Sequence, residues 1–173
     1  MIRHAAGFLV VALLCSQAGA ENPPKLTALQ QQQLFQKNRQ LIQTLVDGSV
    51  EMSNVSNDYT QRSRVYRRMI LEFQKELTTA ADQNDPNRVV EIGKHLDTVM
   101  RQGLAPTLKV ARGRLGPDGT GMNDLIDMRD RSVELADWLQ NKSRAQWKDN
   151  PQVQEVIDSL EKTKKELGGS IAP

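Results

Sequence analysis

The chain has 173 residues, with 23 basic and 21 acidic side chains, two histidines and one cysteine. A net charge of +2 with 38% apolar residues is unlike a disordered charged tail or a polytopic membrane protein, and the length fits one domain or two small ones. A single cysteine excludes an internal disulfide framework, a zinc site of several cysteines and covalent haem attachment. Aromatic residues make up only 4%, so we expect a mostly aliphatic core.

The first twenty residues predict a secretory signal peptide. Arg3 precedes an uncharged apolar run over residues 5–15, and Ala18-Gly19-Ala20 then forms a small-x-small cleavage pattern. The run is shorter than the roughly 20 residues that a helix needs to span a bilayer, so we expect cleavage after Ala20 rather than a permanent anchor. The chain is therefore expected to be a periplasmic or secreted bacterial protein. Lipid attachment at Cys15 and an uncleaved anchor are the alternatives.

Residues 27–168 are predicted to form a single helical domain. An extended leader at residues 21–26 precedes it, because Pro23 and Pro24 disfavour helix, and a disordered tail at residues 169–173 follows it. Apolar residues recur at helical spacing throughout, and no window shows strand alternation. We therefore predict an all-α fold of four to five amphipathic helices, packed as an antiparallel bundle or as a long helical hairpin with satellite helices.

Two helices are predicted in the first part of this domain. Thr27 and Gln30 fit a capping box at the start of the first, and Asp47-Gly48 is its expected stop. The second is predicted over residues 50–81. Because the apolar stripe keeps its phase across Gly48, one unbroken helix over residues 28–81 is the alternative. Such a long helix would favour a coiled-coil homodimer over a monomeric bundle.

Turn and cap residues delimit the remaining helices. Asp85 and Pro86 fit an N-cap and a first helical residue. A kink is expected near Gly103–Pro106, because a proline ring clashes with the carbonyl one turn back. Residues 116–121 form the clearest loop. A second stop and start is expected at residues 148–151.

The sequence carries no signature of catalysis. It has no Walker loop, no G-x-S-x-G and no G-x-G-x-x-G, and the mature chain would lack cysteine. We therefore expect no enzymatic activity and no bound cofactor.

His95 would be the only histidine of the mature chain, and it offers the one alternative with a metal or haem. Glu91 lies one helical turn before it, and methionines such as Met100 could supply a second haem ligand. Metal sites in helical bundles use two Glu-x-x-His pairs with further carboxylates, a pattern that this chain does not have. We interpret His95 as a boundary histidine in a salt bridge or hydrogen bond.

The near-neutral total charge hides a basic block and an acidic run. The basic block consists of Arg62, Arg64, Arg67 and Arg68. The acidic run consists of Asp124, Asp127, Asp130, Glu134 and Asp137. We expect no nucleic-acid binding from a nearly neutral exported protein. The basic block is interpreted either as a solvated or ion-paired face, paired with the acidic run of its own bundle, or as a patch that docks on an anionic envelope surface.

One short string bears on family. Leu26-Thr27-Ala28-Leu29-Gln30 resembles the LTxxQ motif of small all-helical periplasmic stress chaperones, which hold unfolded clients on a cradle of long helices. Those proteins usually carry the motif twice, whereas this chain has one copy, and a capping box explains Thr27 and Gln30 equally well. The resemblance implies a helical periplasmic binding protein.

The sequence as a whole favours an exported, non-enzymatic helical protein that binds through an amphipathic helix face. Its partner would be an envelope protein or an unfolded client. A metal- or haem-binding bundle centred on His95 is the first alternative. A structural or membrane-surface protein that uses the basic block is the second.

Overall fold

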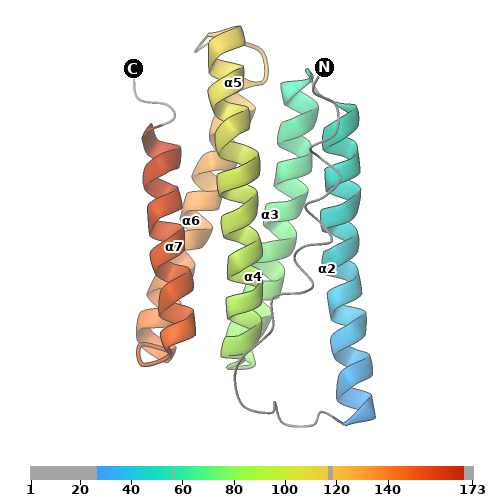
Figure 1. Ribbon diagram of the computed structural model, residues 1–173, viewed down its shortest axis with the longest axis vertical. Coiled ribbons are helices and arrows are strands. Elements are labelled where there is room, and N and C mark those ends of the chain that lie inside the picture. Colours follow the sequence, from blue (N-terminus) through green and yellow to red (C-terminus); the bar gives the residue numbers. More distant parts are fainter. Residues whose placement is uncertain (1–26, 56, 117–118, 170–173) are drawn as a thin grey trace. The chain divides into compact units, whose positions relative to one another are not determined.

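The computed structural model describes residues 27–55, 57–116 and 119–169 (Figure 1). All regular elements in these ranges are helices, which confirms the all-α prediction. None of these helices is long and apolar enough to cross a membrane.

Several predicted terminal features fall outside the described residues. These are the signal peptide with its cleavage residues Ala18 and Ala20, the leader at residues 21–26, and residues 170–173 of the expected tail. The last helix includes Gly169, so it continues one residue into that expected tail.

The chain divides into two compact units, residues 1–54 and 55–173. The first unit contributes one described helix, α2 (Ala28–Asn54), which begins directly after the predicted capping residue Thr27. It runs through Gly48, so the predicted stop at Asp47-Gly48 is wrong. One glycine costs a helix only about 1 kcal/mol, and the well-formed turns on either side outweigh it.

The break in the predicted long stretch lies further along the chain. The backbone leaves α2 after Asn54 and becomes helical again at Tyr59, the start of α3 (Tyr59–Asp82). Asp58 caps α3, because its Oδ1 accepts a hydrogen bond from the Gln61 amide at 2.9 Å. The prediction of a helix from residue 50 was wrong because Asn and Asp side chains compete with helical backbone bonds and favour caps.

The second unit is a bundle of four helical rods. They are α3; α4 (Pro86–Thr98) continued by the π-helix η1 (Val99–Leu104) and α5 (Ala105–Leu115); α6 (Met122–Gln146); and α7 (Pro151–Gly169). α3 packs against α4 and α6, and α7 packs against the same two helices, so the rods close a ring. Figure 1 shows that consecutive rods run in opposite directions, whereas the neighbours α3 and α6, and α4 and α7, run in the same direction.

The predicted disturbance at Gly103–Pro106 takes the form of a π-helix. Pro106 has no amide hydrogen for the carbonyl of Gln102, and its ring would press on that carbonyl in an α-helix. The chain widens to i→i+5 bonding instead, and the Ala105 amide donates to the Met100 carbonyl. The helical rod therefore continues past the proline without a break.

The core of the second unit is mostly aliphatic, as the low aromatic content predicted. Its largest fully buried side chains include Phe73, Leu77, Ile92, Leu96, Met100, Leu104, Leu108, Met122, Leu125, Met128, Leu139 and Leu160. At one end of the bundle the Trp147 indole donates to the Asn84 side chain at 2.8 Å, which ties the α6–α7 connection to the α3–α4 connection. Asn84 has a φ of 51°, a left-handed conformation that asparagine tolerates better than most residues.

Gly93 of α4 lets α7 approach closely, and it provides a test of this packing. A Cβ at Gly93 would lie 2.5 Å from Val156 Cγ1, whereas a Cβ at Gly113 of α5 would meet no described residue within 4 Å. Gly93→Ala should therefore lower the free energy of unfolding by about 1–3 kcal/mol through overpacking. Gly113→Ala, the matched control, should raise it by about 0.5–1 kcal/mol because alanine favours helix. Chemical denaturation measures both, and equal stabilisation by the two variants would contradict this packing.

Candidate functional site

The helix α2 presents large apolar side chains at its surface. Leu29, Phe35, Ile42 and Val50 have exposed fractions of 66%, 69%, 47% and 55%. Single exposed apolar residues are common on protein surfaces. Four large ones on one 27-residue helix are an unusual concentration of exposed apolar surface. Phe35 and Ile42 are seven residues apart, so they lie on the same side of the helix.

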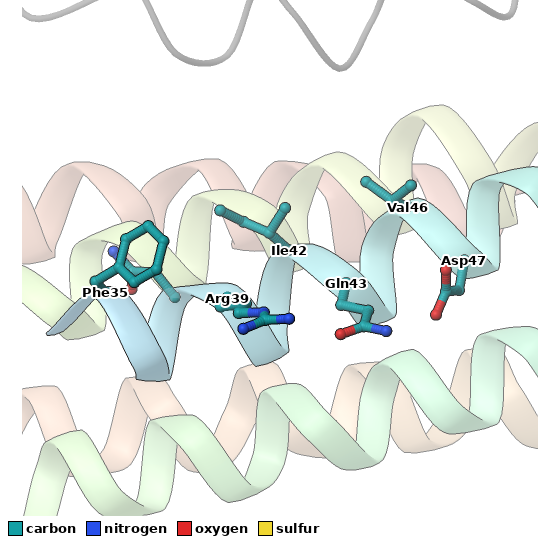
Figure 2. Close-up of a pocket in the computed structure, with 7 residues that line it drawn as sticks. Phe35, Arg39, Ile42, Gln43, Val46 and Asp47 are labelled. Carbon is teal, nitrogen blue, oxygen red and sulfur yellow. The ribbon is translucent and has the colours of Figure 1, made fainter. Parts of the chain in front are cut away.

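A shallow hollow follows α2 beside these residues (Figure 2). All of its lining residues belong to α2: Phe35, Asn38, Arg39, Ile42, Gln43, Val46 and Asp47. Figure 2 shows Phe35, Ile42 and Val46 along one edge, and Arg39, Gln43 and Asp47 along the other. We call this the α2 face. It spans about 18 Å at 1.5 Å per residue, and it combines an apolar row for burial with a polar row for orientation.

The four residues of the predicted basic block have different surroundings. Arg62 donates from Nε to the Val55 carbonyl at 3.2 Å and from Nη1 to the Thr107 hydroxyl at 3.5 Å, so it serves the start of α3 and the contact with α5. Arg67 pairs with Asp127 of α6 at 3.2 Å. Arg64 and Arg68 are exposed. The hypothesis of an ion-paired face is therefore confirmed for Arg67.

The predicted acidic run is largely an ion-paired face. Asp127 accepts from Arg67 and from Arg131, the latter at 3.0 Å. Asp130 pairs with Arg129 at 2.6 Å, and Asp137 pairs with Lys164 of α7. The Arg67–Asp127 pair links α6 to α3, and the Asp137–Lys164 pair links α6 to α7.

A buried hydrogen-bond cluster lies beside the π-helix, and the sequence did not predict it. The Thr107 hydroxyl donates to the Gly103 carbonyl at 2.8 Å, so the Tyr66 hydroxyl, 2.9 Å from Thr107 Oγ1, donates to Thr107. Gly103 is needed for this approach, because a Cβ there would lie 3.2 Å from the Tyr66 ring. Burial raises the pKa of Tyr66, and the hydrogen bond with Thr107 and the charge of Arg62 only partly offset that rise. The cluster joins α3 to α5.

Two buried carboxylates were also missed. Glu76 of α3 accepts from Arg88 of α4 at 2.8 Å, and Arg88 also pairs with Glu91 at 2.7 Å. Burial lowers the pKa of the Arg88 guanidinium, but its hydrogen bonds to the two glutamates outweigh this and raise the pKa above its usual value. Asp97 of α4 accepts from the hydroxyls of Ser159 and Thr163 of α7. Glu76 lies between Phe73 and Leu77 on an apolar stripe. A charged residue at such a position was the sequence signal that could have predicted a buried ion pair.

His95 lies partly buried next to the Arg88–Glu91 pair. Burial lowers the pKa of His95, the Glu91 carboxylate raises it, and the Arg88 guanidinium lowers it again. Within the described ranges, no group of three or more His, Cys, Asp or Glu side chains is placed to hold a metal ion.

Comparisons of the chain with protein-family models, with curated proteins and with solved structures found no match.

The Arg88–Glu76 pair should contribute far more to stability than the exposed Arg67–Asp127 pair. The side chains of the first are 7% and 11% exposed, and those of the second are 52% and 42% exposed. Arg88→Met leaves a buried carboxylate without its main partner and should lower the free energy of unfolding by about 3 kcal/mol. Arg67→Met should cost less than about 1 kcal/mol. The double variant Arg88→Met, Glu76→Leu should recover much of the loss, and equal losses in the two single variants would overturn the assignment.

The lowered pKa of His95 predicts a dependence of stability on pH. A histidine with a lower pKa in the folded than in the unfolded state favours folding while it is neutral. Its contribution is complete above its usual pKa of 6.5 and is lost as the pH falls through the lower folded value. Unfolding free energies measured above and below pH 6.5 should therefore fall more on acidification in the parent protein than in His95→Gln. The same fall in both proteins would contradict the prediction.

Proposed function

We propose that this chain is an exported, non-enzymatic helical binding protein that engages another protein through the α2 face. The single observation that carries the proposal is the exposure of Phe35 and Ile42, which lie on the same side of α2 within this face. Exposed apolar rows on soluble proteins mark surfaces that are covered by a partner.

The chemistry of the α2 face favours a polypeptide as the partner. Burial of a Phe or Ile side chain gains about 1.5–3 kcal/mol, so two or three such anchors suffice for weak to moderate binding. Arg39, Gln43 and Asp47 offer both hydrogen-bond donors and acceptors beside the apolar row. Backbone amides and carbonyls of a peptide can use both kinds, so the face fits an extended or helical protein segment.

Two kinds of protein could supply that segment. An unfolded client offers exposed apolar side chains in many sequences, which suits an adaptable row with little shape specificity. A folded envelope protein would instead present one amphipathic helix or groove. We favour the client, because the hollow on α2 is shallow and lined by residues of a single helix.

The test compares aggregation of a chemically denatured model substrate with and without the protein. The parent protein should suppress aggregation, and Phe35→Glu with Ile42→Glu should abolish suppression because charges on the row cannot be buried. Leu71→Glu is the matched control, since Leu71 of α3 is a comparably exposed apolar residue, at 53%, on the second unit.

Native co-purification from the envelope fraction forms the second arm. A partner that is lost with the α2 variant and kept with Leu71→Glu would identify a folded envelope protein instead of a client. The proposal fails if the parent protein neither suppresses aggregation nor retains a partner that depends on the α2 face, or if Leu71→Glu reduces binding as much.

A further inference from the structure

The end of α5 stands out within the second unit. In Figure 1 its last turns extend beyond the start of α3 and the end of α7. This end carries Lys109, Val110, Gly113, Arg114 and Leu115, which we call the α5 tip. It is part of a different unit from the α2 face and plays no role in the function proposed above.

The α5 tip lies in a stretch without acidic residues. Residues 98–116 contain Arg101, Lys109, Arg112 and Arg114 but no Asp or Glu. Arg101 is paired with Asp97 at 3.3 Å. Arg114 donates to the Asn57 side-chain carbonyl at 2.8 Å. Arg114 and Lys109 are both exposed, and neither forms an ion pair within the described part of the chain.

Apolar side chains lie among these cations. Val110 is 46% exposed and Leu115 is 36% exposed. No described residue lies within 4 Å of a Cβ built on Gly113, so this side of α5 is open. Basic residues near a helix C-terminus stabilise the helix dipole, but that effect does not require apolar neighbours in contact with water.

We propose that the α5 tip binds the anionic surface of a phospholipid membrane. Lys109 and Arg114 would contact lipid phosphates, and Val110 and Leu115 would enter the boundary between headgroups and acyl chains. Basic residues with interspersed apolar residues are the combination that peripheral helices use at such surfaces.

The shape of the tip favours a membrane over an acidic protein. An end that extends beyond the neighbouring helices fits a flat surface that yields around it, whereas a peptide or a folded partner is normally bound in a groove or on a broad complementary area. The small number of charges predicts weak, salt-dependent association. It would place the bundle beside the membrane.

Vesicle co-sedimentation tests the proposal. The purified protein should bind vesicles of phosphatidylcholine mixed with phosphatidylglycerol, but not vesicles of phosphatidylcholine alone, and added salt should release it. Lys109→Gln with Arg114→Gln should lower the partition coefficient about fivefold for each charge, roughly 25-fold for the pair. The matched control is Arg144→Gln with Lys148→Gln, which removes two exposed charges near the end of α6, at the opposite end of the bundle, and should bind as the parent does.

A fluorescent reporter tests the contribution of the apolar residues. In a Cys15→Ser background, an environment-sensitive dye on Val110→Cys should shift to the blue with anionic vesicles, and the same dye on Leu71→Cys should not. Circular dichroism confirms that each variant is folded. The proposal would be overturned if the protein did not bind anionic vesicles at low salt, or if both double variants lost vesicle binding equally. It would also be overturned if the tip were needed only for the capture of an acidic protein.

Discussion

The amide hydrogen that Pro106 lacks determines the form of the helical rod from α4 to α5. A proline inside a helix normally breaks or kinks it, because one backbone bond is lost and the ring presses on a carbonyl. Here the turn widens to a π-helix, and the Thr107 hydroxyl bonds to the Gly103 carbonyl. The rod from α4 to α5 therefore stays continuous, and α3, α6 and α7 all pack against it.

The π-helix also explains why polar residues are buried beside it. The Tyr66 ring fits against Gly103, and its hydroxyl donates to Thr107, so the irregular turn is tied to α3. One turn of the rod earlier, Asp97 ties α4 to α7 through Ser159 and Thr163. An aliphatic core specifies helix register only loosely, whereas a buried polar group has few acceptable positions. These contacts fix the register of the rods.

The charges fall into two classes. Those on facing helices, such as Arg67 with Asp127 and Lys164 with Asp137, are used inside the bundle. Lys109 and Arg114 at the α5 tip form no ion pair within the described residues, and this difference, rather than the total of +2, favours an anionic partner. The α2 face and the α5 tip belong to different units of the chain.

The sequence by itself determined the helical class and most helix boundaries. Apolar spacing, the Asp85-Pro86 cap and the glycine-rich loop at residues 116–121 act over a few residues, so local physics suffices to recognise them. The sequence did not predict the helix break near Asp58. The apolar stripe continues across it, and that periodic signal was given more weight than the side chains that can cap a helix. Only the tertiary structure decided which charges pair, that Glu76 and Asp97 are buried, and that the Arg62–Arg68 block is divided between internal contacts and solvent. Those outcomes depend on which helices become neighbours, and helical periodicity shows where each apolar face lies but not which helix will cover it.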